Sequence, residues 1–195
     1  MFQYSFLKMK KNHIVIKSYK MYSKNIIMKV KKTIGEIIID RGHRIIDQHN
    51  DYFLVQKSDS SEMIVFFSMF EKLNTSILKE YIKEIEKNQI NHMIIVYRDK
   101  ITASVNKIID TIFHLNIELF TFQNLLFNIT KHRLYRPHIL LSASEKNKFI
   151  QKYGKQIPKI LVNDPIVKYF NYKLGDILKI VRKNNFISYR IVKNE

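Results

Sequence analysis

The carboxylates are the residues of this sequence with the most obvious capacity for chemistry on nucleic acid. A metal-dependent nuclease uses carboxylates to hold magnesium, usually with a lysine two positions after one of them on a strand. None of the 17 Asp and Glu residues has Lys at the second position after it. Glu84 and Glu86 form a close pair, but in a predicted helix a spacing of two places them on different faces. We interpret them as solvated helix charges.

The histidines, glycines and serines also lack the spacing that catalysis needs. No two of the seven histidines are three or four residues apart, the spacing that puts two zinc ligands on one helical face. The four glycines are scattered singly, so there is no phosphate-binding loop. There is no cysteine, and Ser142 is read as a helix cap, not a nucleophile. We therefore predict a protein without catalytic residues, metal or cofactor.

Hydrophobic patterning in the first 130 residues predicts strands that alternate with helices. Apolar residues recur at helical spacing over 25–40, and Gly42 follows where a left-handed residue ends a helix. Crossover helices of about 10 to 13 residues indicate an α/β domain with a partly parallel sheet. The predicted strands are 13–17, 43–46, 52–55, 63–67, 93–97 and 117–120, and the further helices are 75–87 and 102–112.

The last third of the chain predicts a small α+β unit. Ser142 with Glu145 fits a capping box for a helix that ends near Gly154. Asp164 followed by Pro165 fits an N-cap and first helical residue, with the helix reaching Phe170. Residues 176–182 and 186–192 alternate as an antiparallel hairpin. At about 65 residues such a unit is near the lower limit of independent stability, so we expect it to dock on a partner.

The net charge is +17, from 34 basic and 17 acidic residues. Such an excess attracts polyanions, and nucleic acid is the first partner to consider. The alternative is an AT-rich genome, which raises Lys, Asn and Ile together and leaves lysine as a solvated face. From residue 131 onward there are 15 basic and 4 acidic residues. The smaller unit is thus the more basic one.

Two further sequence features bear on partners and location. Tyr169, Phe170 and Tyr172 lie near lysines and could stack on bases, but aromatic residues beside a short sheet more often belong to a core. No apolar run approaches the roughly 18 residues of a membrane span. Lysines interrupt the apolar part of the first 19 residues, so secretion is not expected. We expect an intracellular protein.

Seven segments of the C-terminal part form an ordered block: 128–132, 137–139, 142–146, 156–160, 164–170, 175–182 and 188–190. This block resembles the assembly domain of the fifth-largest subunit of eukaryotic-type DNA-dependent RNA polymerases. Archaeal RNA polymerases carry that domain alone as a separate small subunit. Upstream, residues 36–42 resemble the end of the family's first helix, and 96–102 resemble the strand and loop of its jaw domain.

The resemblance implies a non-catalytic subunit that takes part in transcription. It implies a nuclease-like jaw domain at 25–130 that borders downstream duplex DNA, and an assembly domain at 131–195 that docks on the largest subunit. Residues 1–24 have no counterpart in the family and are predicted to be a basic extension. The DNA-facing residues would be Lys100, Thr102, Ser104 and Lys107, with phosphate contacts that carry no sequence information. The subunit-docking residues would be Pro137, His138, Pro158, Asp164, Pro165, Gly175, Arg182, Tyr189 and Arg190.

Several positions depart from the family pattern. Ala103 replaces a proline that is usual in the jaw loop, and Asn171 replaces a common glycine. Two connections in the C-terminal part are shortened. These changes predict a divergent member, encoded by a large DNA virus, in the host cytoplasm or virion, or else a cellular protein of the nucleus. The alternatives are a magnesium-dependent DNA nuclease and a stand-alone nucleic-acid-binding protein.

Overall fold

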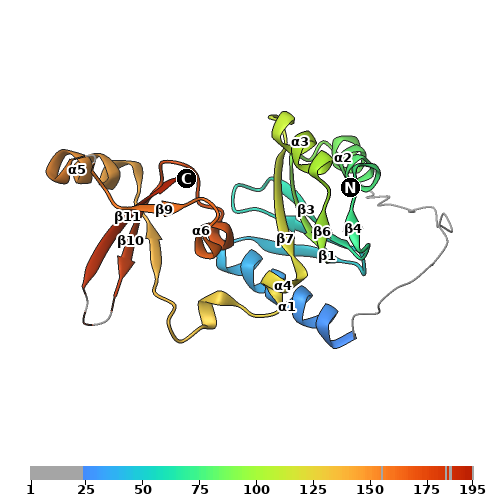
Figure 1. Cartoon of the computed structure of the whole chain (residues 1–195), viewed down its shortest axis with the longest axis horizontal. Helices are drawn as coiled ribbons and strands as arrows, with labels where there is room; N and C mark the ends of the chain where they lie inside the picture. The colour runs from blue at the N-terminus through green and yellow to red at the C-terminus, as the bar shows by residue number, and fades with distance from the viewer. Residues whose placement is uncertain (1–23, 155, 183, 185, 195) are drawn as a thin grey trace.

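The computed structural model describes residues 24–154, 156–182, 184 and 186–194. The predicted strand at 13–17 lies outside them. The described chain contains two larger sheets, one in each half, which lie side by side (Figure 1). The elements of the first half are α1 (Lys24–Asp40), β1 (Arg44–Gln48), β2 (Tyr52–Gln56), β3 (Glu62–Ser68), β4 (Lys72–Leu73), α2 (Thr75–Lys87), β5 (His92–Tyr97), β6 (Lys100–Ile101), α3 (Ala103–Thr111), β7 (Asn116–Thr121) and α4 (Phe122–Leu125).

The first sheet has five strands in the order β1-β2-β3-β5-β7. Strands β1, β2 and β3 are antiparallel neighbours, whereas β3, β5 and β7 run parallel. Helices α2 and α3 lie in the two parallel connections, so the prediction of a partly parallel sheet is confirmed. The short strands β4 and β6, which the sequence did not reveal, form a separate parallel pair.

Helix α1 ends where Gly42 allows the chain to turn. Gly42 has φ +75°, a conformation that costs glycine little. Its N–H donates to the carbonyl of Ile39, and the N–H of His43 donates to the carbonyl of Ile38. These two bonds are the Schellman arrangement, which satisfies the last helical carbonyls. The following residue, Arg44, begins β1 directly.

Two apolar cores cover the two faces of the first sheet. On one face, α1 buries Val30, Ile34, Ile37 and Ile38 against strand residues such as Val65. On the other, α2 and α3 pack over a second cluster that contains Ile77, Leu78, Ile85 and Val105. The sheet is therefore the middle layer of a three-layer unit.

Strand β1 is a free edge of this sheet. It pairs with β2 alone, and its register with β2 shifts between Ile45 and Asp47. Such a shift is a β-bulge, which twists the strand and leaves one residue without a partner. Arg44, Asp47 and Gln48 are exposed along this edge.

The second half contains a four-stranded sheet in the order β8-β10-β11-β9. The predicted hairpin is confirmed as β10 and β11, and the N–H of Arg182 donates to the carbonyl of Phe186 to close it. The sequence missed β9, which is parallel to β11 and too short for a periodic pattern. The elements are the 3-10 helix η1 (Ile129–Lys131), β8 (His138–Leu140), α5 (Ala143–Tyr153), β9 (Lys159–Leu161), α6 (Pro165–Phe170), β10 (Ile177–Val181) and β11 (Ile187–Lys193).

Both helix starts predicted in this half are confirmed. Ser142 and Glu145 form the reciprocal bonds of a capping box at α5. The side chain of Asp164 accepts from the N–H of Ile166, and Pro165 is the first helical residue of α6. These caps satisfy backbone groups that a short helix would otherwise leave bare.

Helix α6 belongs to both halves of the molecule. Its Val167 packs in the small C-terminal core, whereas Tyr169 packs in the core under α1. The Tyr169 ring is 3% exposed, so the interpretation of this residue as core is confirmed. Its hydroxyl donates to Asp40 at 2.6 Å. The proposed division at residue 130 stays a prediction, but the two halves share this helix.

No helix in the described part of the chain combines the length and apolarity that crossing a membrane requires.

Candidate docking groove and the adjoining contact network

An open groove of about 660 Å³ crosses one face of the C-terminal sheet. Residues of η1, β8, β9, α6, β10, β11 and the segment before β8 line it. We call it the C-terminal groove. Its lining is Ile129, His132, Leu134, Tyr135, Arg136, His138, Lys159, Ile160, Leu161, Asn163, Asp164, Ile166, Ile180, Arg182 and Arg190.

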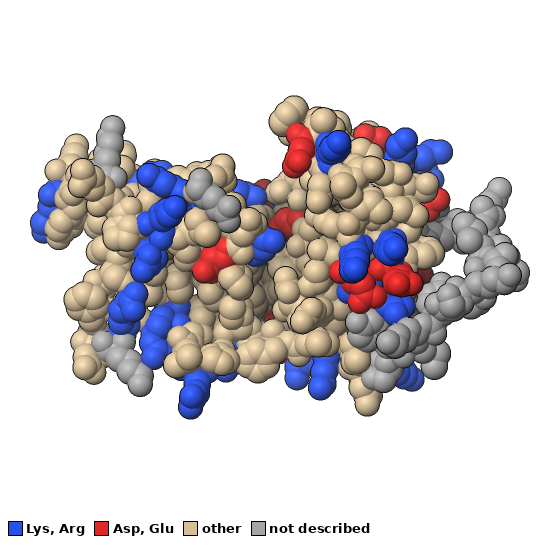
Figure 2. All heavy atoms as spheres, in the orientation of Figure 1, with Lys and Arg blue, Asp and Glu red and all other residues tan. Residues whose placement is uncertain are grey.

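The C-terminal groove combines an apolar floor with a basic rim. Ile160, Ile166 and Ile180 are all less than 10% exposed and form the floor. Arg136, Lys159, Arg182 and Arg190, with two histidines, supply the basic groups, against a single carboxylate. That carboxylate, on Asp164, already accepts the N-cap bond of α6 at 2.8 Å. Figure 2 shows blue Lys and Arg atoms gathered over this half of the molecule, on the left.

The rim arginines are held in place by bonds to their own chain. Arg182 Nε donates to Ser188 Oγ at 3.0 Å, and Arg190 Nη1 donates to the Lys159 carbonyl at 2.9 Å. Arg136 Nη1 donates to the Tyr135 carbonyl at 2.7 Å. Among the described residues, no carboxylate lies within ion-pair distance of these three guanidinium groups. Each guanidinium has five N–H donors, so most of them remain for a partner.

His138 is fixed at the β8 side of the C-terminal groove. Its Nδ1 lies 2.6 Å from the Arg136 carbonyl, so Nδ1 carries the proton and donates. The hydroxyl of Tyr172 donates to the His138 carbonyl at 2.7 Å. The first contact orients the His138 ring, and the second holds the backbone of β8 at this position.

The structure brings together only part of the predicted docking set. His138, Asp164, Arg182 and Arg190 all line the C-terminal groove. Three prolines are exposed at the starts of elements next to it: Pro137 before β8, Pro158 before β9 and Pro165 in α6.

Two predicted docking residues lie elsewhere. The Tyr189 ring packs against the Phe149 ring of α5, with centroids 4.4 Å apart and planes tilted by 42°. Gly175, at φ +83°, accepts a bond from Lys146 Nζ at its carbonyl. Both therefore hold α5 and a turn in place. Because successive strand residues point to opposite faces, Tyr189 and Arg190 separate onto the two sides of the sheet.

Other lining residues were missed from the sequence. Leu134 is 65% exposed although it is a large apolar residue. Together with Tyr135 and Arg136 it occupies the irregular stretch before β8, which has no periodic pattern. Lys159 belongs to the missed strand β9. The run of apolar and basic residues before Pro137 was the available signal.

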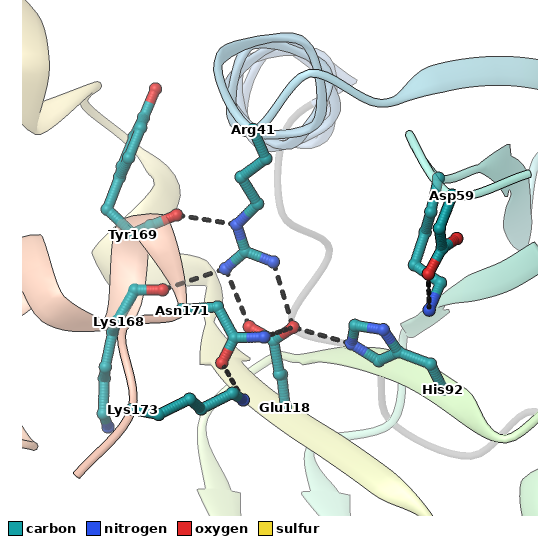
Figure 3. A network of polar contacts seen from close by, with 9 residues as sticks. Arg41, Asp59, His92, Glu118, Lys168, Tyr169, Asn171 and Lys173 are labelled. Atoms are coloured by element: carbon teal, nitrogen blue, oxygen red, sulfur yellow. Dashed lines mark hydrogen bonds and ion pairs between the residues drawn. The ribbon is translucent and has the colours of Figure 1, made fainter. Parts of the chain in front are cut away.

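A network centred on Arg41 joins the two halves beside this region (Figure 3). Arg41 follows α1, and its guanidinium forms two bonds to Glu118 of β7, at 2.9 and 2.7 Å. It also donates to the carbonyls of Tyr169 and Lys168 in α6, at 2.8 and 2.9 Å. The Arg41 side chain is 4% exposed and that of Glu118 is 10% exposed. The buried Arg41–Glu118 pair therefore connects the first sheet to α6 through hydrogen bonds.

Glu118 is the most strongly perturbed carboxylate of the network. Burial by itself would raise its pKa, but the hydrogen bond from His92 and the charge and bonds of Arg41 outweigh burial and lower the pKa to about 2. Asn171 Nδ2 also donates to Glu118, at 3.0 Å. With φ +56°, Asn171 adopts the left-handed conformation that glycine favours. Glu118 thus stays ionised and bonded to three side chains.

The predicted DNA-facing residues lie at the start of α3. Lys100 is in β6, and Ser104 and Lys107 are in α3, so the predicted loop is a short strand that leads into a helix. These three are exposed. Thr102 is at the N-cap of α3 with its hydroxyl oxygen buried. Ala103 is the first helical residue, a position that also suits proline.

Among the described residues, no three His, Asp or Glu side chains come together as a metal site would need.

Comparison with known proteins identifies the C-terminal half. Residues 127–192 match the family model "RNA polymerase Rpb5, C-terminal domain". These residues are similar to the C-terminal domain of Rpb5. Every residue that lines the C-terminal groove lies within the matched Rpb5 segment.

The similarity to Rpb5 proteins extends well beyond that domain. The chain is 29% identical over 191 residues to the "DNA-directed RNA polymerases I, II, and III subunit rpabc1" of Dictyostelium discoideum, which covers 86% of this chain and 97% of the relative. It is 26% identical over 200 residues to the RPABC1 subunit of Caenorhabditis elegans, covering 85% and 95%. The resemblance seen in the sequence is confirmed, and the similarity extends over most of the chain beyond residues 127–192.

Proposed function

We propose that the chain is a non-catalytic structural subunit of a multisubunit DNA-dependent RNA polymerase. The observation that carries this proposal is the match of residues 127–192 to the Rpb5 C-terminal domain, joined to similarity with RPABC1 subunits over most of the chain. The chemistry of the described residues agrees with an accessory role. Glu118, the carboxylate with the most strongly shifted pKa, is hydrogen-bonded to Arg41, His92 and Asn171. It is therefore not presented to a substrate.

We infer that the C-terminal half docks on the largest subunit of that polymerase. Four residues predicted for docking, His138, Asp164, Arg182 and Arg190, converge on one groove. A groove with an apolar floor and a charged rim has the composition of a protein interface, with an apolar centre and a polar border. The three exposed prolines beside it extend the same surface.

The first half is proposed to be the jaw domain, with a nuclease-like fold that lacks catalytic residues and borders downstream duplex DNA. Its mixed sheet covered by helices on both faces is compatible with that assignment. Lys100, Ser104 and Lys107 are exposed close together in sequence at the start of α3 and would contact phosphates. Thr102 supports the turn into α3, since its hydroxyl is buried.

Affinity purification of the tagged chain from its native cells tests the assignment. We expect the largest polymerase subunit to be recovered in equal amount, together with the other subunits. Recovery of the chain as a free monomer would contradict the proposal. A magnesium-dependent cleavage assay on duplex DNA distinguishes the nuclease alternative, for which we expect no cleavage.

The compartment follows from the polymerase that contains the subunit. A cellular enzyme places it in the nucleus, and a viral enzyme places it in the host cytoplasm or the virion. The viral origin stays a prediction. Imaging of the tagged chain with a second labelled polymerase subunit checks the compartment directly.

A further inference from the structure

We propose that the C-terminal groove binds an acidic, extended segment of another polymerase subunit, whose apolar side chains rest on the floor while its carboxylates pair with the rim arginines. This inference rests on the proposed function, because it specifies the chemistry of the partner that the subunit docks on. It is carried by the shape, charge and burial of the groove itself.

The apolar floor of the groove is complementary to apolar side chains of the bound segment. Ile160, Ile166 and Ile180 form a continuous apolar bottom beneath the opening. At the rim Leu134 is 65% exposed and Ile129 is half-buried. Covering such a surface stabilises a complex by about 25 cal/mol of free energy for each Å² of apolar area removed from water. An occupant that brought only charged groups would leave this contribution unused.

The basic rim of the groove is complementary to carboxylates of the bound segment. Arg182 directly follows β10, Arg190 lies on the neighbouring antiparallel strand β11, and both line the groove. Each is tied by one bond to its own chain, Arg182 to Ser188 and Arg190 to Lys159, so the side chains are ordered before a partner arrives. Ordering in advance lowers the entropic cost of association. Guanidinium groups match the planar geometry of a carboxylate with two parallel bonds.

The charge balance of the lining excludes a basic occupant. Four Arg and Lys side chains and two histidines face one carboxylate, and Asp164 already caps α6. A lysine-rich segment would meet these cations at close range, and like charges in a partly desolvated interface cost several kcal/mol. The complementary segment is therefore acidic.

Nucleic acid is the other polyanion that a basic groove attracts, and the floor argues against it. Grooves that bind single strands place aromatic rings under the bases. Among the described lining residues, Tyr135 is the only Phe, Tyr or Trp, and the floor is isoleucine. Phosphates paired with the rim would leave the isoleucines uncovered, whereas a strand-like peptide alternates its side chains and satisfies both surfaces.

A photo-crosslinking experiment on the assembled polymerase identifies the occupant. A photoreactive phenylalanine derivative replaces Leu134, and we expect the fold to accept it because this side chain is exposed. After affinity purification of the intact polymerase and irradiation, mass spectrometry identifies the linked peptide. We expect an Asp- and Glu-rich segment with interspersed apolar residues from another subunit. A link to a neutral or basic segment, a link to nucleic acid, or no link to protein overturns the inference.

A competition experiment tests the rim. Differently tagged wild-type chain and the double variant Arg182→Glu/Arg190→Glu are expressed together, and their ratio in purified polymerase is measured. Reversal of two charges that the partner would cover should lower the incorporated ratio about 30-fold or more. The matched control Lys79→Glu/Lys83→Glu, on the exposed face of α2, should incorporate like the wild type.

The outcomes separate this inference from the proposed function. Equal incorporation of the rim variant would overturn the acidic-segment inference and leave the polymerase assignment standing. Failure of the wild-type chain to enter a polymerase would instead overturn the assignment. Thermal unfolding of the purified rim variant controls for folding, since Arg190 also bonds to Lys159. Should that variant unfold, the crosslink from Leu134 decides.

Discussion

Arg41 and Glu118 are 77 residues apart in the chain and share two parallel hydrogen bonds in a nearly solvent-free position. The same guanidinium reaches the carbonyls of Lys168 and Tyr169 in α6. One side chain therefore ties the end of α1, strand β7 and helix α6 together. The orientation of the C-terminal groove relative to the first sheet depends on this contact and on the Tyr169–Asp40 bond.

Replacing Arg41 with alanine should destabilise the protein strongly. The change leaves Glu118 buried without its main counter-charge, and breaking a buried pair from one side costs about 3–5 kcal/mol. Urea unfolding followed by circular dichroism measures the loss. Arg44→Ala, at an exposed position three residues on, is the matched control and should shift stability by no more than about 0.5 kcal/mol. A loss of the same size in both variants would contradict the role of the pair.

Acid should weaken the fold through Glu118. Its pKa is lowered from 4.5 to about 2 in the folded protein, so its contribution is complete above the unfolded pKa and is lost as pH falls toward 2. The shift corresponds to about 3 kcal/mol. Glu118→Gln should be less stable than the wild type at neutral pH, and the difference should shrink by about that amount as pH falls through this window. A difference that stayed constant with pH would show that another group is responsible.

Asn171 should accept glycine more readily than alanine. Its φ of +56° is left-handed. This conformation costs alanine about 1–2 kcal/mol of free energy, whereas glycine adopts it without that cost. Both variants lose the bond to Glu118 and the bond from Lys173 Nζ equally. Asn171→Ala should therefore be less stable than Asn171→Gly by about 1 kcal/mol. Equal unfolding midpoints would mean that the turn relaxes to another conformation.

Charge reversal at Lys100 and Lys107 should weaken the hold of the polymerase on downstream DNA without preventing assembly. Both lysines are exposed, and each lost phosphate contact lowers the salt dependence of binding by about one charge. Filter binding of purified polymerase over a salt series measures the slope. The control is Lys79→Glu/Lys83→Glu, which removes the same charge from α2. An unchanged slope for the Lys100/Lys107 variant would show that the start of α3 does not reach DNA.

Local signals in the sequence were sufficient for most elements. The helix at 75–87 was predicted to the residue, because its apolar spacing is regular and Lys87 precedes a polar break. The left-handed helix end at Gly42 and the capping box at Ser142 were predicted because these motifs depend on residues only a few positions apart. Strands β4, β6 and β9 were missed since two or three residues cannot show a period.

The candidate site could be predicted only in part, and for a physical reason. Asp164 and Arg182 were named because family motifs carry them, but no local pattern shows which of the named residues share a face. Neighbouring strand residues point to opposite faces, which separates Arg190 from Tyr189. Arg190 and Arg136 line the same groove only because the folded sheet brings them to one face. The Arg41–Glu118 pair was not predicted, since long-range ion pairs between single charged residues leave no trace in sequence spacing.

The bulge in β1 has a consequence for how many copies of the chain can gather. A flat outer strand is a template on which another molecule can extend the ladder, and such growth leads to fibres. Here the ladder loses its regularity between Ile45 and Asp47, and charged Arg44 and Asp47 border the break. The bulge and these charges therefore oppose pairing of β1 with β1 of another copy while the chain is free and not yet assembled into a polymerase.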